Sequence, residues 1–176
     1  MDNSLPVTYL LLFVVLLAAA AWFVFRQVWK TRRTEQLFSR LQKKLKTEKG
    51  TPQEYYELGC LYSDKKLYTK AIKLFEKSLK CDDIPERESA LVYNALGYVY
   101  VVKEQYDLAI RQYKEALKAN PDYAIAFNNI GFAYEKKNLI AQALESYERA
   151  LQIAPNNATA KKRYNSLQKR LSPTSS

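Results

Sequence analysis

The chain has 176 residues, which is room for one domain of modest size beside a membrane-spanning segment. It contains four glycines, six prolines and no histidine, so turn-rich β architectures are disfavoured and the commonest general base and metal ligand are absent. The net charge of +10 is uneven: residues 26–50 carry +7, residues 51–157 carry −1 and residues 158–176 carry +5. Charge placed beside an apolar segment indicates membrane topology rather than nucleic-acid binding.

Residues 5–25 form an uninterrupted uncharged run that predicts a transmembrane helix. Coiled as a helix, this run rises about 31 Å, which matches a hydrocarbon core of about 30 Å. Four basic residues follow between Arg26 and Arg33, whereas Asp2 is the only charged side chain before the run. By the positive-inside rule we expect residues 1–4 to be translocated and the rest of the chain to stay in the cytoplasm or, in a plastid, the stroma.

A cleaved signal peptide is the alternative interpretation of the same run, because Ala18–Ala21 fit a cleavage site. Signal peptides carry a basic region before the apolar segment, and that region is missing here. The strongest positive cluster instead follows the run. The sequence therefore favours a retained single-pass anchor.

Residues 26–50 predict a basic amphipathic juxtamembrane helix. Leu37, Leu41 and Leu45 recur every fourth residue, which places them on one helix face, and basic residues fill much of the remainder. This leucine stripe can rest on anionic lipid headgroups, or it can pack on the first part of the domain that follows. The sequence leaves both open.

A repeated pattern fills the middle of the chain, centred on Gly59, Gly97 and Gly131. In each copy an aromatic residue precedes Leu-Gly or Ile-Gly, a tyrosine follows, and an alanine stands 12 residues after the glycine with a second aromatic four residues later. This is the tetratricopeptide (TPR) pattern, in which glycine and alanine let two helices approach closely while aromatic side chains fill the space between them. We therefore predict an all-α chain in which a transmembrane helix precedes an α-solenoid. Its three TPR helix-turn-helix repeats span residues 51–157, at 52–85, 90–123 and 124–157.

The first repeat departs from the other two. Ser78 stands where they have alanine, Asp83 stands where they have proline, and Gly59 and Gly97 are 38 residues apart rather than 34. We expect the extra residues to form a longer loop at 81–89. The spacing predicts helices near 52–65, 68–80, 90–103, 106–119, 124–137 and 140–153.

Residues 158–171 predict a C-terminal capping helix. Tyr164, Leu167 and Leu171 form one apolar stripe and the other faces are charged or polar, as the end of a repeat stack requires. The last five residues, 172–176, predict a disordered tail.

The first helix of each repeat, helix A, predicts a concave protein-binding groove. Asn128 and Asn129 suit a bound backbone, and a lysine and an arginine on the cap suit an acidic group on a ligand. Helix packing is the alternative role for most positions. The candidates are Tyr56, Cys60, Leu91, Asn94, Tyr98, Ile125, Asn128, Asn129, Phe132, Lys162 and Arg163.

No residue pattern here predicts catalysis. The chain lacks histidine, a Gly-rich phosphate loop and any polar pair outside the repeats, and Cys60 and Cys81 belong to no CxxC pair. We expect both thiols to be reduced and buried. The sequence predicts a protein-interaction scaffold that is not an enzyme, with no catalytic residue, metal site, cofactor or nucleic-acid partner.

The anchor at 5–25, the basic linker, the three repeats and the short cap together resemble one family. These are the small TPR proteins of cyanobacteria and plastids known as hypothetical chloroplast frame thirty-seven. The resemblance implies a thylakoid membrane protein whose TPR domain faces the cytoplasm or stroma. It also implies binding to photosystem I subunits or assembly intermediates, in support of photosystem I assembly or stability. The alternatives are a membrane-tethered TPR receptor or adaptor in organelle import or bacterial envelope assembly and, after signal cleavage, a soluble periplasmic TPR protein.

Overall fold

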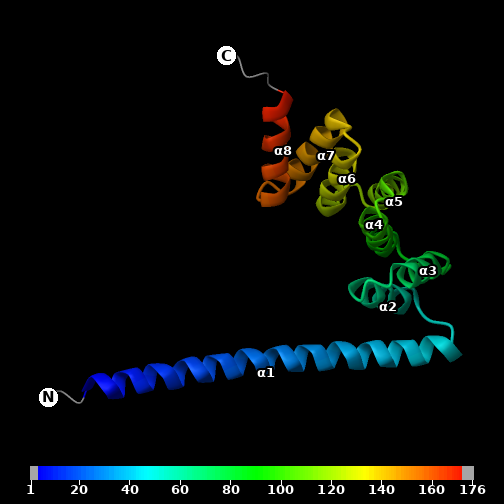
Figure 1. Cartoon of the computed structure of the whole chain (residues 1–176). Helices are drawn as coiled ribbons and strands as arrows, with labels where there is room; N and C mark the ends of the chain where they lie inside the picture. Colours follow the sequence, from blue (N-terminus) through cyan, green and yellow to red (C-terminus); the bar gives the residue numbers. More distant parts are fainter. Residues whose placement is uncertain (1–3, 172–176) are drawn as a thin grey trace, which may run out of the picture. The chain divides into compact units, whose positions relative to one another are not determined.

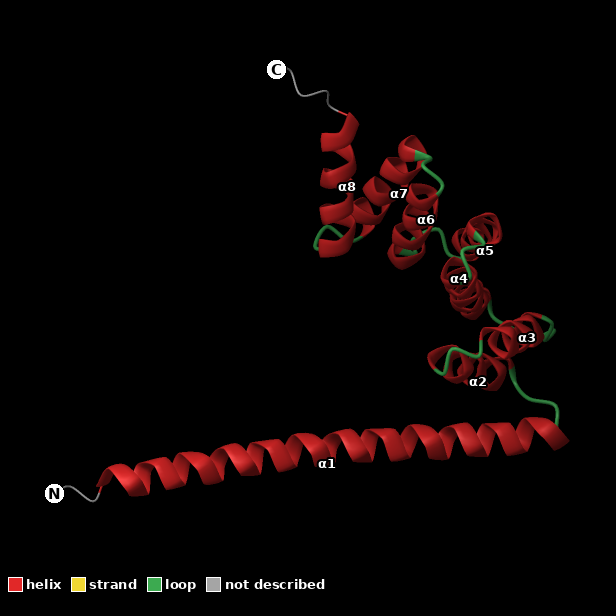
Figure 2. Ribbon diagram, viewed as in Figure 1, coloured by secondary structure: helices red, strands yellow, loops and turns green. Residues whose placement is uncertain are grey.

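The computed structural model of the chain describes residues 4–171, which form eight α-helices and no strand (Figure 1, Figure 2). Residues 1–3 of the expected translocated N-terminus and the whole expected tail at 172–176 lie outside this range. The chain divides into two compact units, one ending at Glu48 and the other beginning at Lys49.

The first unit is a single helix, α1 (Ser4–Thr47), of 44 residues. Its apolar part has a mean hydropathy of 2.5 over 18 residues, none of them buried. The large apolar side chains between Tyr9 and Phe25 are each more than half exposed. By length and composition alone, α1 is the one helix of the described residues that is long and apolar enough to cross a membrane.

The second unit contains seven helices that pack as antiparallel neighbours. Helices α2 with α3, α4 with α5, and α6 with α7 form pairs, each second helix contacts the first helix of the next pair, and α8 packs on α7. The first helices also touch one another, α2 with α4 and α4 with α6. This is the predicted all-α TPR solenoid. The bounds are α2 (Pro52–Asp64), α3 (Tyr68–Leu79), α4 (Glu86–Val102), α5 (Tyr106–Ala119), α6 (Ala124–Lys136), α7 (Ile140–Ile153) and α8 (Ala158–Leu171).

The start of the solenoid is fixed by a capping box. The Thr51 hydroxyl accepts from the backbone N–H of Glu54 at 3.2 Å, and the Glu54 carboxylate accepts from the backbone N–H of Thr51 at 3.1 Å. Pro52 occupies the first turn, where its missing N–H costs no hydrogen bond. The buried Ser78 hydroxyl donates to the carbonyl of Pro52 at 2.8 Å. The serine that breaks the repeat pattern therefore ties α3 to the beginning of α2.

Each helix pair closes on a contact between a glycine and an aromatic ring. A Cβ added to Gly59 would lie 2.6 Å from the Phe75 ring, and one added to Gly97 would lie 2.5 Å from the Tyr113 ring. Such approaches are closer than side chains tolerate, so only glycine allows the two helices to come this near. The signature glycines are thus explained by packing.

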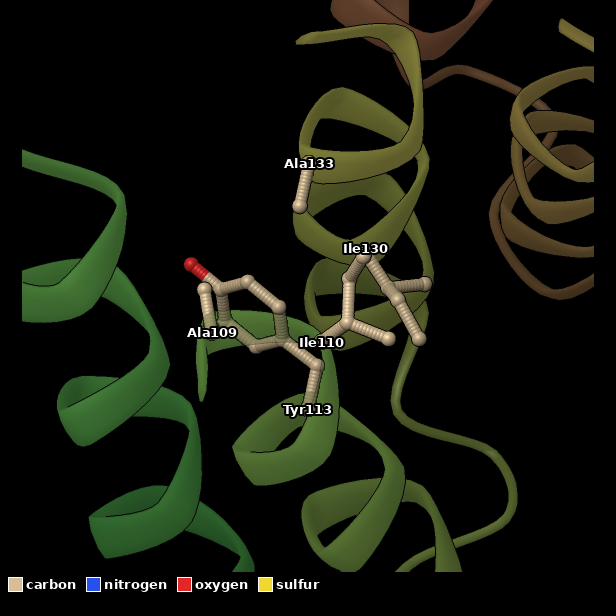
Figure 3. Close-up of a cluster of buried hydrophobic side chains, with 5 residues drawn as sticks. All are labelled: Ala109, Ile110, Tyr113, Ile130 and Ala133. Atoms are coloured by element: carbon tan, nitrogen blue, oxygen red, sulfur yellow. The ribbon is translucent and has the colours of Figure 1, made fainter. Parts of the chain in front are cut away.

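The core continues from one pair to the next. Between α5 and α6, Tyr113 and Ile130 pack together with small alanines around them (Figure 3). A second buried cluster joins α7 to α8 through Tyr147 and Leu167. Large rings alternate with alanines in both clusters, which is how neighbouring helices interdigitate at native density. The full first cluster is Ala109, Ile110, Tyr113, Ile130 and Ala133, and the second is Ala143, Tyr147, Ala150, Ala160 and Leu167.

One predicted boundary is wrong. The expected loop at 81–89 is shorter, because α4 begins at Glu86 rather than near residue 90. Pro85 stands immediately before the helix with φ −64° and ψ 146°, an extended conformation suited to a helix start. Glu86 and Glu88 then lie in the first turn, where negative charge interacts favourably with the helix dipole.

Candidate protein-binding surface

The four helices α2, α4, α6 and α8 present the predicted binding residues on what we call the A-helix surface. Three large apolar side chains are exposed there: Leu91 is 39% exposed, Tyr98 54% and Ile125 57%. Among residues 49–170, the other two exposed large apolar residues are Leu67 and Val102, which lie at or beside turns. Apolar exposure outside α1 therefore gathers mainly on α4 and α6, on the surface that the sequence predicts.

Helices α4 and α6 are joined across this surface by two asparagines. The Asn129 side-chain amide donates to the side-chain oxygen of Asn94 at 2.9 Å. Both residues are half-buried, so this bond is shielded in part from solvent. Asn129, a predicted backbone-binding residue, is therefore brought together with the groove candidate Asn94, and it also holds two helices in register.

Asn128 differs from its neighbour. Its side-chain oxygen is buried, and within the described residues it has no hydrogen-bond partner. An acceptor left without a donor carries its desolvation cost uncompensated, which is of the order of 1–3 kcal/mol. Surrounding protein atoms therefore shield this oxygen from an outside partner.

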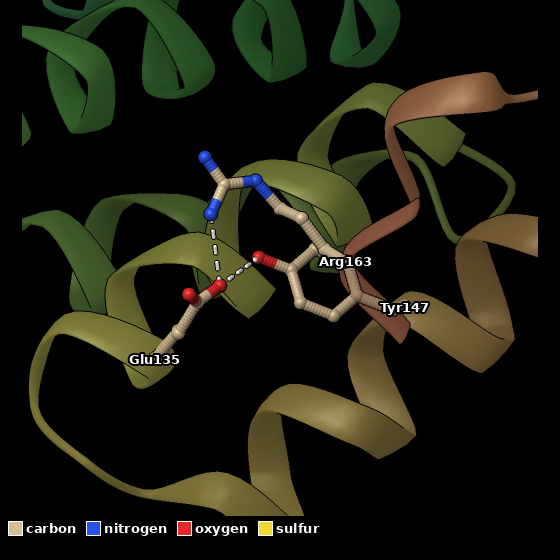
Figure 4. Close-up of polar contacts among 3 residues, drawn as sticks. All are labelled: Glu135, Tyr147 and Arg163. Atoms are coloured by element: carbon tan, nitrogen blue, oxygen red, sulfur yellow. Dashed lines mark hydrogen bonds and ion pairs between the residues drawn. The ribbon is translucent and has the colours of Figure 1, made fainter. Parts of the chain in front are cut away.

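The α6–α8 end of the surface carries charged side chains, of which Arg163 and Glu135 already form an ion pair. Arg163 donates to the Glu135 carboxylate at 2.9 Å, and the Tyr147 hydroxyl donates to the same carboxylate oxygen at 3.0 Å (Figure 4). The Arg163 guanidinium also lies over the Phe132 ring, 4.5 Å from its centroid, and Lys136 lies 5.5 Å from the same centroid. Phe132 is consequently covered by cations and is half-buried, so it is not an open apolar floor.

Burial dominates the titration of Tyr147. Its loss of hydration, followed by the nearby Glu135 carboxylate, raises the pKa of Tyr147 above its usual value, while Arg163 lowers it. The hydroxyl thus keeps its proton for the bond to Glu135. Sequence reasoning includes Tyr147 only as a packing aromatic of the repeat pattern and does not single out Glu135. The only available signal is a glutamate at the position of Val101 in the preceding repeat.

A pocket of about 510 Å³ opens beside this network, between α6 and α8. The predicted Lys162 lines it and is exposed. Two hydroxyl side chains outside the predicted set, those of Thr159 and Ser166, line it as well. The remaining lining residues are Glu135, Ala158 and Arg163.

At the first-repeat end of the A-helix surface the predicted residues Tyr56 and Cys60 have uncharged side chains. Tyr56 is half-buried, with its ring 6.0 Å from that of Phe75, and burial with the neighbouring Cys60 raises the pKa of its hydroxyl. Cys81 is buried as expected, whereas Cys60 is only half-buried, and both thiols are free with pKa values raised by burial. Within the described residues, no three Cys, Asp or Glu side chains gather in a way that could hold a metal ion.

Comparison with protein families identifies the repeats. The TPR repeat profile matches residues 97–138, and tetratricopeptide repeat profiles match residues 55–83 and 124–157. Together these segments contain Gly59, Gly97 and Gly131, while residues 84–96 lie between the first two matches.

Several curated proteins are similar along most of the chain. A ycf37 protein of Cyanophora paradoxa is 38% identical over 125 residues, covering 71% of this chain and 73% of the relative. A ycf37 protein of Guillardia theta is 33% identical over 126 residues, covering 71% of each chain. The chloroplastic tetratricopeptide repeat domain-containing protein PYG7 of Arabidopsis thaliana is 35% identical over 122 residues, which is 69% of this chain but 40% of the longer relative.

Solved structures show the same fold at lower identity. The crystal structure of MamA superposes with a TM-score of 0.71 at 24% identity, covering 80% of this chain and 82% of that one. The first TPR of Spaghetti (RPAP3), solved with an HSP90 peptide, superposes with a TM-score of 0.64 at 22% identity, covering 70% and 95% of the two chains. At these identities the likeness concerns the fold.

Proposed function

The chain belongs to the ycf37 family of TPR proteins, and from this membership we propose that it is a membrane-anchored adaptor that assists photosystem I assembly or stability at the thylakoid membrane. The TPR fold and the TPR relatives indicate a protein-interaction scaffold. The plastid setting is supported by the chloroplastic relative in Arabidopsis thaliana. Photosystem I is the finer part of the proposal and follows from the family resemblance.

The observation that carries the binding role is the exposure of Leu91, Tyr98 and Ile125 on the A-helix surface. Burying these three side chains under a partner would remove apolar area from water, which is the main favourable term in association. Aromatic side chains such as Tyr98 commonly dominate such interfaces. The partner is proposed to lie along the concave side of the solenoid, in contact with α4 and α6.

The anchor is proposed to be the apolar part of α1. Its mean hydropathy of 2.5 and its lack of buried residues suit lipid surroundings, and the basic residues that follow suit the cytoplasmic or stromal side. The TPR unit would then work at the membrane face on which photosystem subunits are assembled.

The test is co-purification from a photosynthetic host. The tagged full-length chain is expected to capture chlorophyll–protein subunits of photosystem I, and a Tyr98→Ala/Ile125→Ala variant should lose most of that capture while staying membrane-bound at normal level. The matched control is Lys114→Ala/Glu115→Ala, exposed on α5 away from the A-helix surface, which should capture normally. If the Tyr98/Ile125 variant captured normally and loss of basic residues in 30–46 abolished capture, α1 would be the binding element and the surface assignment would be refuted.

A further inference from the structure

The second helix of the first repeat, α3, carries four exposed lysines on one side. They follow one another at intervals of three and four residues, which places them on one face of a helix with 3.6 residues per turn. This lysine face consists of Lys70, Lys73, Lys77 and the C-cap residue Lys80. Residues 65–80 hold six lysines and one glutamate and so carry +5, whereas residues 51–157 as a whole carry −1. Positive charge in the repeats is therefore concentrated on α3 and its ends.

The repeat pattern does not require these lysines. The four places carry a net charge of +4 in α3, but the corresponding places carry +1 in α5 and 0 in α7. Those places hold Leu108, Arg111, Glu115 and Lys118 in α5, and Gln142, Glu145, Arg149 and Gln152 in α7. The lysine face thus distinguishes the first repeat, which follows α1 after four residues, 48–51.

The charge of the lysine face is not compensated by ion pairs. Within residues 4–171, none of its four lysines pairs with an acidic side chain. Lys70 lies 5.4 Å from the ring centroid of Tyr62, and Lys77 lies 5.8 Å from that of Tyr55. An aromatic ring has no net charge, so these contacts direct two of the lysines toward α2 without neutralising them.

The one acidic residue of 65–80, Glu76, lies toward the other neighbouring helix. Burial, followed by the nearby Glu76 carboxylate, raises the pKa of Tyr100 on α4. The carboxylate and the two lysines that contact α2 therefore lie at different edges of α3. The face keeps most of its positive charge.

We propose that the lysine face of α3 rests on the anionic lipid headgroups of the membrane in which α1 is anchored. This inference rests on the anchor in the proposed function and adds a second membrane contact, made by the repeat unit itself. Because α3 does not belong to the A-helix surface, the contact leaves that surface free for a protein partner.

The tether favours lipid over an acidic protein as the occupant. Four residues join α1 to the first repeat, so an anchored chain presents this repeat to the bilayer at high effective concentration. Residues 26–50 carry +7 and are attracted to the same anionic surface. Lysines that come within about 10 Å of the headgroups, the Debye length at 0.1 M salt, add to this attraction.

The test measures how fast single lysines of the full-length chain are acetylated by an uncharged N-hydroxysuccinimide ester. The chain is placed in nanodiscs of phosphatidylcholine alone, or of equal parts of phosphatidylcholine and phosphatidylglycerol, and modified peptides are quantified by mass spectrometry. The four lysines of the face should react at least about threefold more slowly in the anionic discs, since a surface potential of about −30 mV lowers the fraction of uncharged amine by this factor. Lys114, exposed on α5, should react equally in both discs. In about 1 M salt, where the Debye length is about 3 Å, the difference should disappear.

The repeats supply a matched pair of variants. Lys73→Glu/Lys80→Gln gives α3 the residues that α7 has at the same places, so the fold is kept, and the two remaining lysines of the face should then react equally in both discs. Arg111→Glu/Lys118→Gln puts the same two residues into α5 with the same change of charge, and it should leave the protection of the lysine face unchanged.

Equal rates for the native chain in the two discs would overturn the lysine-face assignment alone. Protection that persists in the α3 variant, or that the α5 variant loses as fully, would overturn it as well. Protection in membranes from a photosynthetic host but not in the protein-free anionic discs would assign the face to an acidic protein instead of lipid. Failure of the chain to insert into either disc would count against the anchor in the proposed function, and with it this inference.

Discussion

At the scale of single residues, the glycine–aromatic contacts set how closely the helices of each pair pack. The space at the three glycines is not equal: an added Cβ would meet the ring at 2.6 Å in the first pair, 2.5 Å in the second and 2.9 Å in the third. The obstructing atoms belong to buried rings that cannot swing away, since Phe75, Tyr113 and Tyr147 are each at most 1% exposed. The middle pair should therefore be the least tolerant of a side chain at its glycine, Gly97.

Replacing Gly97 should destabilise the repeat unit by overpacking. We expect Gly97→Ala to lower the free energy of unfolding by about 1–3 kcal/mol and Gly97→Leu to lower it further. Gly131→Ala should cost less, because its ring lies farther away. Chemical denaturation of residues 49–176 measures the series. Equal midpoints for the native unit and Gly97→Leu would show that this contact does not hold the pair together.

Buried tyrosines make the unit sensitive to alkali. Burial raises the pKa of Tyr113 above the value near 10 that it has in the unfolded chain. A raised folded pKa means that the stability it supports is complete below pH 10 and is lost as the pH rises further, because only the unfolded state then ionises readily. For the 1% exposed Tyr113 the loss approaches about 1.4 kcal/mol per pH unit.

The repeat pattern itself supplies the variant that tests this. Phe75 occupies the place of Tyr113 in the first repeat, so Tyr113→Phe is expected to keep its stability at pH 7. At pH 11 it should lose less stability than the native unit, in urea titrations at both pH values. An equal loss of unfolding free energy between pH 7 and pH 11 in the two proteins would exclude Tyr113 as a source of the alkaline destabilisation.

At the scale of elements, the turns between the two helices of each pair carry local strain. Lys66, Glu104 and Asn138 have positive φ angles of 60°, 58° and 58°. This left-handed conformation suits glycine and is tolerated by asparagine, but it is unfavourable for lysine and glutamate. Two of the three turns thus use residues poorly matched to their backbone.

Glu104→Gly should stabilise the repeat unit. Relief of the left-handed conformation outweighs the larger entropy of an unfolded glycine, and we expect a net gain of about 0.5–1 kcal/mol. Asn138→Gly should gain less, because asparagine already accepts this conformation. Lys103→Gly is the adjacent control with φ −85°, and it should be neutral or destabilising. A loss of stability in Glu104→Gly, measured as a lower denaturation midpoint, would contradict this account of the turn.

The elements were largely predictable because the repeat leaves little freedom. The spacing predicts helices at 106–119 and 140–153, and α5 and α7 have these bounds. The predicted start of α4 was too late, because the proline and three acidic residues in the segment 82–86 are also typical of a loop. In the structure Pro85 instead stands directly before the first residue of the helix. The binding candidates were placed by position alone. Which of them pair with one another depends on side-chain geometry, so the Asn94–Asn129 bond and the cover of Arg163 over Phe132 had no signal in the sequence.

At the scale of the whole molecule, the chain combines an apolar helix with a repeat unit that forms its own core. The unit from Lys49 onward contains both buried clusters. The apolar part of α1 has no buried residues of its own. Exposed apolar surface of this extent is the basis on which we propose that α1 anchors the chain in lipid.

If α1 anchors the chain, membrane extraction should separate its two parts. The full-length chain is expected to stay with membranes washed in alkaline carbonate, and a chain lacking residues 1–25 should appear in the supernatant. Added protease should degrade the TPR unit only from the cytoplasmic or stromal side. Release of the full-length chain by carbonate would argue for a peripheral or cleaved protein.

The nearest-neighbour packing of the helices also decides where the molecule opens first. Helix α5 is held by α4 and α6, whereas α8 has α7 as its main packing partner and closes the described stack. In such a linear array, thermal fraying costs least at the ends, so amide hydrogens of α8 should exchange with solvent faster than those of α4 and α5. The pocket between α6 and α8 is built in part from this fraying end. A partner bound in this pocket would therefore slow amide hydrogen exchange in α8 more than in the other helices. The affinity for such a partner would depend on the fraction of molecules in which α8 is packed on α7.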